Sequence, residues 1–551
     1  MRREGRSLDD AVILALVLYS GSLLLFSYLF YRDMVWSILR TLSEPEYSYI
    51  AVIMFSLFVL GLLSLMEGLV RVTRSLPPIR VLLAALLVSL SILFFTVSEI
   101  ALQYDVELKA ISFLLLAWSF ASVLFRFREA SSFILVLTSM ALVPLPASLL
   151  DSVSIWLSRF LGRLAARMLG AEYVSTPLGS YIYVAGPHGV SRLDVTLACS
   201  GIVSLSSILA VAPIIAYIVS RSSGSGFRKT IALAASLVVA VAAVLLGNLA
   251  RIVLVAREVS KGATGQLLAV FHQAPSAIYV AVAILLAVIV AQRIAGGWRP
   301  VSRAEEPPGS WPSGVFVAFV GVVLFSVALF SLVASATPPS HLGGVSGNIT
   351  SFTELASNPS IILTRANITV LHAAPDKRIA AILGETNVVS ALIQYNGSRY
   401  QAYIELAESP TRFHSWSVCL GYQGYRILEK YSSIYNGQPV TVYHAVRGNT
   451  SYVVAFTVYK LAASFGPTFH PVYVKLTLLR RLAPGESLAV VAAEAAKLLG
   501  VIGLANGQRG VVYMERVEAA TKATYYILGV LALYLAASYL YERMVRRGKT
   551  L

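Results

Sequence analysis

The main pattern along the chain is a series of apolar segments, each about 20 residues long. An α-helix needs that length to cross the hydrocarbon core of a bilayer. The first segment follows a short basic stretch and is long enough to span, so it predicts a retained anchor and not a cleaved signal peptide. We expect ten transmembrane helices, near residues 11–30, 49–70, 81–98, 108–125, 131–150, 198–219, 230–250, 274–292, 313–335 and 523–541.

Basic residues cluster in alternate loops between these segments. By the positive-inside rule, this predicts a multi-pass protein of the cell membrane with both termini in the cytoplasm. Arg32 and Arg40, in the first outer loop, go against the rule. So does the outer segment 154–169, in which arginines recur every four residues opposite an apolar face. This segment predicts an amphipathic helix in the outer interface, or alternatively a half-inserted continuation of the preceding span.

Residues 340–520 have a different pattern. Polar and apolar residues alternate in 399–408, 439–446 and 451–460, which predicts strands, with a turn at 447–451. A helical pattern over 486–500 ends at a glycine. We therefore expect a polytopic α-helical membrane protein with an inserted extracytoplasmic α+β domain. Four Asn-X-Ser/Thr sequons fall in this segment and support its external position: Asn348, Asn367, Asn396 and Asn449.

Composition agrees with a membrane protein. Of 551 residues, 57% are hydrophobic and 13% are charged, whereas a soluble domain is roughly 25% charged. The net charge is +16, but many of the positive residues lie in the short loops that fix topology. Membrane lipids are therefore expected partners, and nucleic acid is not.

Three reactive side chains are expected at the same depth, near the outer face of the membrane. Cys199 opens the sixth span, Arg251 lies at the outer end of the seventh, and His272 precedes the eighth. A thiol near a cation or an imidazole becomes a nucleophile, and the imidazole can pass the thiol proton to a leaving amine. The guanidinium can stabilise the thiolate or an oxyanion. This combination favours acyl transfer.

Neighbouring residues fit the same chemistry. Asn248 shares a helix face with Arg251, because the two are three residues apart, and could orient the substrate. Ser200 and Gly201 follow the cysteine, and glycine permits close approach of the backbone. Taken singly, the three reactive residues have ordinary explanations: a buried thiol, a snorkelling arginine and an interfacial histidine. Their convergence at one leaflet favours catalysis.

The stretches ACSGI (198–202) and NLAR (248–251), followed by His272, resemble the exosortase/archaeosortase family of membrane transpeptidases over roughly residues 130–295. The resemblance implies that Cys199 is the nucleophile and that Arg251 and His272 are essential. It also implies protein substrates with C-terminal sorting signals and transfer to a membrane-anchored acceptor, such as a lipid. The sequons fit an archaeal cell surface, which favours archaeosortase.

The stretch FHSWSVCLGYQGYRI (413–427) resembles the exosortase-associated periplasmic domain. It departs from that domain at 415–417, where a Pro-Glu pair is expected, and at Tyr425, where tryptophan is usual. His414 and Cys419 are candidates for a second thiol site. Two alternatives stay open: Cys419 packs in a β-domain, or it forms a disulfide with Cys199 that silences the nucleophile.

These observations together predict five parts of the chain. Residues 1–130 form scaffold helices, 131–300 the archaeosortase-like catalytic core, 301–339 a linker and transmembrane helix, 340–520 the extracytoplasmic domain, and 521–551 a last transmembrane helix with a basic cytoplasmic tail.

The alternative function from another class is a transporter or surface-polymer export component, in which Arg251 and His272 line a polar pathway. Spans six to eight carry no acidic residue and the chain shows no inverted repeat, which favours the enzyme. The histidines have no metal-ligand spacing with the two cysteines, so no metal and no cofactor are expected.

Overall fold

The structure, a computed structural model, covers the chain from Asp10 to Ala505 with short gaps. The described residues are 10–42, 47–67, 70–73, 77–99, 101–127, 138–176, 179–186, 189–195, 201–262, 266–297, 313–335, 352–364, 366–383, 387–435, 438–465 and 468–505.

Within these residues, six helices are long and apolar enough to cross a membrane, and two further apolar helices are shorter. The six are α1 (Asp10–Leu29), α4 (Pro78–Ser98), α5 (Asp105–Leu124), α9 (Gly226–Ser260), α10 (Gln266–Ala295) and α11 (Ser313–Ser335). The shorter pair is α3 (Ser48–Met66) and α8 (Ile202–Ser220). The helices confirm a polytopic membrane protein, whereas the number ten stays a prediction. The expected span 523–541 lies outside the described residues.

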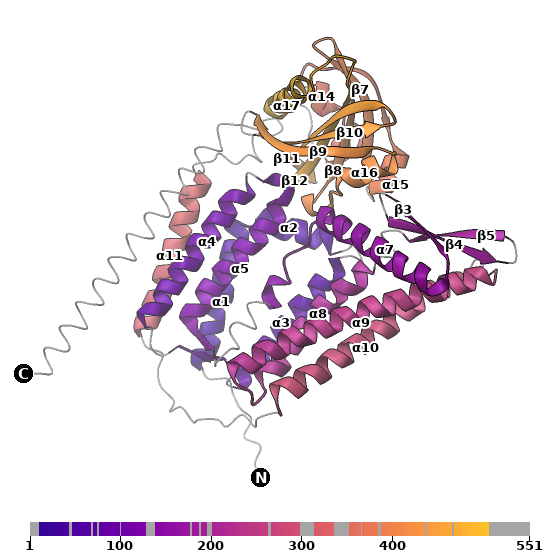
Figure 1. The fold of residues 1–551 in the computed structure, drawn as a ribbon. Helices are drawn as coiled ribbons and strands as arrows, with labels where there is room; N and C mark the ends of the chain where they lie inside the picture. The colour runs from indigo at the N-terminus through magenta and orange to yellow at the C-terminus, as the bar shows by residue number, and fades with distance from the viewer. Residues whose placement is uncertain are drawn as a thin grey trace, which may run out of the picture.

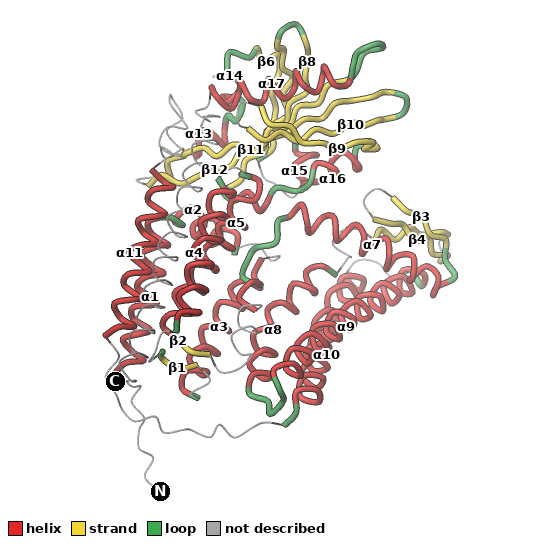
Figure 2. The backbone as a smooth tube through the Cα atoms, turned by 60° about the vertical axis from the view of Figure 1, so that its left-hand side comes forward, coloured by secondary structure: helices red, strands yellow, loops and turns green. Residues whose placement is uncertain are grey.

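The helices form two groups, which Figures 1 and 2 both show. One group contains α1, α4, α5 and α11, packed through a shared apolar cluster. The other contains α3, α8, α9 and α10. In the second group α10 presents alanine at every fourth position, at Ala283, Ala287, Ala291 and Ala295, and all four are buried. Small residues at this spacing let two membrane helices approach closely, which explains the tight pairing of α9 with α10.

The predicted span at 131–150 is not a single helix. Residues 141–146 form turns and α7 (Ala147–Leu169) begins after them, while 128–137 lie outside the described residues. Pro144 and Pro146 account for the break, because proline lacks a backbone N–H and disfavours helical geometry before it. The predicted amphipathic helix at 154–169 is confirmed as part of α7, separate from any helix before the break. It buries one face and exposes Trp156 and Phe160 on another.

A strand-rich region (352–505) lies at one end of the helices (Figure 1). Its seven antiparallel strands are ordered β6-β7-β8-β12-β11-β10-β9. One face packs against α17 (Leu488–Ala505) and the other against α16 (Trp416–Tyr422). The predicted strands are confirmed as β8, β10 and β11, and the predicted turn joins the last two. The strands are β6 (Thr369–Pro375), β7 (Val388–Tyr395), β8 (Ser398–Ala407), β9 (Arg426–Tyr435), β10 (Gln438–Arg447), β11 (Thr450–Phe465) and β12 (Thr468–Arg481).

The predicted helix end at Gly500 is wrong, because α17 continues to Ala505. Gly500 serves packing instead. A Cβ at this position would lie 2.4 Å from Cδ1 of Tyr435, at the end of the edge strand β9. The absence of a side chain therefore lets the tyrosine ring approach the helix backbone, and a capping glycine cannot be told from a packing glycine by its place in the sequence.

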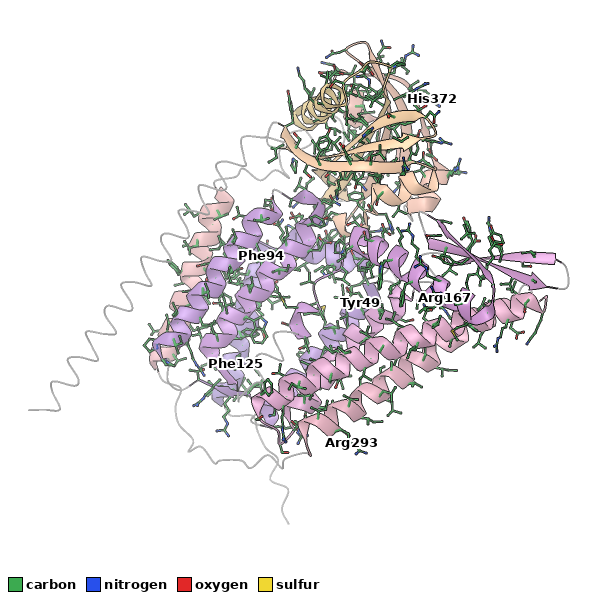
Figure 3. The ribbon with its side chains drawn as sticks, viewed as in Figure 1. Tyr49, Phe94, Phe125, Arg167, Arg293 and His372 are labelled. Atoms are coloured by element: carbon green, nitrogen blue, oxygen red, sulfur yellow. The ribbon has the colours of Figure 1, made fainter. Side chains whose placement is uncertain are left out.

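Two small sheets complete the described structure. At the end of the helices opposite the strand-rich region, β1 (Val70–Val72) pairs with β2 (Phe125–Phe127) and sets Arg71 opposite Arg126. Figure 3 shows Phe125 and Arg293 at that same end. Next to α7, the strands β3 (Glu172–Thr176), β4 (Gly179–Gly186) and β5 (Gly189–Val195) form an antiparallel sheet that leads toward α8. Sequence patterns did not predict either sheet.

Candidate active site

The segment that carries Cys199 is anchored at both of its described ends. Cys199 and Ser200 themselves lie outside the described residues. Before them, Val195 ends β5 and is buried in one cluster with Leu161 of α7 and Val253 of α9. After them, Gly201 precedes the first residue of α8. Val195 and Gly201 therefore lie on either side of Cys199 and both pack on α9, at residues on either side of position 251.

Gly201 fits closely against Asn248. Its φ is +80°, a left-handed conformation that glycine adopts without strain. A Cβ added to it would lie 2.8 Å from Nδ2 of Asn248. Both the backbone conformation and the space around Gly201 therefore require glycine. This contact joins the start of α8, two residues after Cys199, to the middle of α9.

Asn248 and Arg251 are both buried on α9, with 0% and 6% of their surface exposed. Burial of a guanidinium is costly unless its charge and hydrogen bonds are satisfied. A snorkelling arginine would instead extend its charged end to the headgroups. Arg251 is therefore an internal charged residue of a membrane helix, which makes it a candidate for function.

His272 lies on α10, and its side chain is outside the described part of the structure. The backbone nevertheless places the position. Gly247 of α9 packs on Tyr279 of α10, since a Cβ at 247 would lie 2.3 Å from that of Tyr279. Because the two helices are antiparallel, position 272 is level with position 254, one helical turn beyond Arg251. Positions 272 and 279 also share a helix face, since seven residues make about two turns.

Tyr279 and Ser204 are residues that sequence reasoning missed. The hydroxyl of Tyr279 lies 2.8 Å from Oγ of Ser204 on α8. Tyr279 therefore contacts α8 through its hydroxyl and α9 through its ring and Cβ, next to the Gly201–Asn248 contact. The available signal was its spacing of two turns from His272, which places a polar group on the same face of α10.

The length of α9 indicates the depth of this site. The helix has 35 residues, which corresponds to about 52 Å at 1.5 Å per residue, whereas the hydrocarbon core is about 30 Å thick. Asn248 lies 22 residues after the start of α9 at Gly226, or about 33 Å along its axis. The site therefore lies near the bilayer boundary if α9 enters the membrane at its first turn.

The second predicted pair is not arranged as a thiol site. Cys419 is a free, fully buried cysteine on α16, and its Sγ accepts a hydrogen bond from Nε2 of Gln423 at 3.2 Å. Burial raises the pKa of the Cys419 thiol to about 12, which keeps it protonated. The structure therefore gives no support to a Cys199–Cys419 disulfide. His414 contacts Asp151 of α7, with 2.8 Å between Nδ1 and Oδ1.

Three of the four sequons lie in described residues, and their asparagines are exposed: Asn367, Asn396 and Asn449. Asn348 lies outside the described residues. Asn367 and Asn396 adopt positive φ values of 54° and 48°, which asparagine tolerates better than most residues. In the described part of the chain, no three His, Cys, Asp or Glu side chains gather as a metal site would require. That no metal or cofactor takes part stays a prediction.

Residues 36–289 match the model of the transmembrane exosortase family. The match, over just under half of the chain, supports membership of the exosortase family for these residues. The match contains α3 to α9, most of α10 and all three motif stretches. It also begins well before position 130, so α3, α4 and α5, which carry no motif, are part of the family region. The matched family is one of membrane-bound sorting enzymes of the transpeptidase kind. Comparisons with curated proteins and with solved structures give no match.

Proposed function

We propose that this protein is a cysteine transpeptidase that cleaves the C-terminal sorting signals of surface proteins at the outer leaflet. It then transfers the shortened protein to a membrane-anchored acceptor, such as a lipid. One observation carries the proposal: Gly201, two residues after Cys199, packs on buried Asn248, one turn from buried Arg251. Covalent geometry keeps a Cα within about 7 Å of one two positions away, so Cys199 cannot be far from this contact.

The residues divide the chemistry among them. The thiolate of Cys199 attacks the scissile carbonyl carbon, and Arg251 stabilises the oxyanion that forms. His272 takes the thiol proton and gives it to the leaving amine, so the C–N bond breaks and a thioester remains. The acceptor nucleophile then gives its proton to His272 and attacks the thioester carbonyl, so the C–S bond breaks and the thiolate of Cys199 recovers that proton. Asn248 orients the substrate, and Gly201 lets the start of α8 pack closely on Asn248.

The topology proposed from sequence fits the arrangement of the helices. The basic pair Arg71 and Arg126, with Arg293, lies at the end opposite the strand-rich region (Figure 3). The positive-inside rule puts that end, and both termini, in the cytoplasm. The strand-rich region, with its exposed sequon asparagines, is then extracellular. We place the catalytic core at 131–300 and the extracytoplasmic domain at 340–520.

The deciding experiment compares Cys199→Ala with wild type in the native host, by mass spectrometry of the C-termini of surface proteins. We expect uncleaved precursors to accumulate in the variant, because no thioester can form. Cys419→Ala is the matched control, since it removes the other, buried thiol and should leave processing intact. Unchanged mature C-termini in Cys199→Ala would reject transpeptidation and favour the transporter.

A further inference from the structure

The strand-rich region contacts α7 at one carboxylate, that of Asp151. Nδ1 of His414 lies 2.8 Å from Oδ1 of Asp151, and the backbone N–H of Ser415 donates to Oδ2 at 2.8 Å. The Asp151 side chain is 4% exposed and that of His414 25% exposed. Each carboxylate oxygen thus has its own partner at a largely buried contact, which fixes the carboxylate more firmly than a surface ion pair would. We call this contact the Asp151 clamp.

The loop behind the clamp is held firmly on the sheet. Nζ of Lys475 on β12 donates to the backbone oxygen of His414 at 2.6 Å. Lys475 also pairs with Glu405 on β8 at 3.6 Å, and Nε1 of Trp416 donates to Oε1 of Glu405 at 2.6 Å. Lys475, Glu405 and Trp416 are all fully buried. The loop is bonded to two central strands. A displacement of Asp151 therefore displaces the sheet and not the loop alone.

On the other side of the clamp, α7 packs against the elements that hold the candidate active site. Leu161 and Ala165 share one buried cluster with Ile252 and Val253, which follow Arg251 on α9. The same cluster contains Val195, the last described residue before Cys199. Figures 1 and 2 both show α7 between the strand-rich region and α9. A single helix, α7, therefore lies between His414 and the residues next to Cys199 and Arg251.

The clamp is separate from the main attachment of the strand-rich region. That attachment lies on α2 (Arg32–Thr41) and α5, where Lys460 binds Asp33 and Asp105, each at 3.0 Å. His470 also stacks on Trp36 of α2, with ring centroids 3.8 Å apart. The region can thus stay docked when the clamp is lost, and the effect of that loss falls on α7.

We propose that Asp151 and His414 are positioning residues, through which the strand-rich region holds α7 and thereby sets the geometry of Cys199 and Arg251. This inference rests on the proposed function, because it takes Cys199 as the nucleophile. It also gives the 413–427 stretch a role other than thiol chemistry: the stretch docks this region onto the catalytic helices.

The test measures the alkylation of Cys199 by iodoacetamide against pH, in the full-length protein in lipid nanodiscs, with each thiol followed by peptide mass spectrometry. Asp151→Ala, His414→Ala and the double variant should each react more slowly at neutral pH, and the double variant no more slowly than the singles. The rate should fall about threefold per unit of increase in the thiol pKa, because a tenfold loss of thiolate is partly offset by greater nucleophilicity.

Two variants and a second readout separate positioning from general damage. Asp151→Asn keeps an oxygen that accepts from Ser415 and should retain most of the reactivity. Arg399→Ala removes an exposed charge in the same region and should change nothing. Hydrogen exchange should rise over 147–169 in Asp151→Ala, while the amides of α2 and α5 stay protected.

Unchanged alkylation and unchanged exchange over α7 in Asp151→Ala would overturn the inference. So would equal loss of protection in α2 and α5, since the residue would then only hold the fold together. If wild-type Cys199 reacts as an ordinary thiol and its loss spares the surface C-termini, the proposed function fails. Exchange over α7 would still decide whether the clamp holds that helix.

Discussion

Gly201 combines two constraints that a sequence motif cannot separate. Its positive φ would strain any residue with a side chain, and its Cα lies against the amide of Asn248. Gly448, in the turn between β10 and β11, shares the first constraint with a φ of +59°, but no atom lies within 4 Å of its added Cβ. Comparing substitutions at Gly201 and Gly448 therefore separates the effect of backbone strain from the effect of the Asn248 contact.

We expect Gly201→Ala to lose surface-protein processing and Gly448→Ala to keep it. Both variants incur roughly 1–2 kcal/mol of left-handed backbone strain, but only the first pushes α8 away from Asn248 and moves Cys199. Processing in the host and alkylation of Cys199 are the two measurements. Equal activity in the two variants would show that the Asn248 contact does not position the thiol.

For other single residues, the sequence indicated the kind of role but not the residue that each one contacts. Burial of Arg251 removes the snorkelling explanation, and burial of Cys419 supports a structural cysteine. His414 was singled out as a chemical residue, yet its partner Asp151 is 263 positions away in the sequence. Local patterns contain no information about a contact of that separation, because it depends on how two folded regions dock.

At the scale of elements, α17 shows how a glycine can be interpreted wrongly. The helix continues past Gly500, because this glycine makes room for Tyr435 beside the helix backbone and does not end the helix. Gly500→Leu should lower the stability of the strand-rich region by about 1–3 kcal/mol, the usual cost of overpacking. Thermal unfolding of the full-length protein measures this.

Ala493→Leu is the control for that prediction. It adds the same side chain to an exposed position of the same helix, so it should leave the melting temperature nearly unchanged. A Gly500→Leu variant that melts with the control would mean that Tyr435 can move away at little cost.

Elements with a strong period were predictable, and those without one were not. The strands β8, β10 and β11 alternate because every second residue faces the main apolar cluster, as Ile404, Val442 and Ala455 do. The predicted span at 131–150 is apolar enough for a helix, but Pro144 and Pro146 interrupt it. In the sheet β3-β4-β5 the two edge strands, β3 and β5, are mostly exposed, so their apolar pattern is too weak to identify.

At the scale of the whole molecule, charged groups join the strand-rich region to the membrane helices. Lys460 is 1% exposed and binds both Asp33 and Asp105. The hydroxyl of Tyr473 also donates to Asp105, at 2.6 Å. The neighbouring carboxylates raise the pKa of Lys460 well above its ordinary value, against the effect of burial. Lys460 therefore stays charged, and it shares Asp105 with Lys109 of α5, whose Nζ lies 2.9 Å from Oδ1 of that acid.

Lys460→Met should loosen this docking by less than about 3–5 kcal/mol, the cost of a fully uncompensated buried charge, because Lys109 still pairs with Asp105 at 2.9 Å. Hydrogen exchange at α2 and at the start of α5 should rise, and the melting temperature should fall. Arg399→Ala again serves as the control, because it removes only an exposed charge of the same region. Full protection of α2 in Lys460→Met would show that apolar packing alone holds the two regions together.

The sequence by itself determined the polytopic class, the strand-rich region near the C-terminus and the three motif stretches, because hydrophobic periodicity and residue chemistry are local properties. The tertiary structure decided that Gly201 meets Asn248, that α7 is a separate helix, and that His414 grips Asp151. Each of these depends on the shapes of surfaces that exist only after distant segments have packed, so no local pattern can encode them.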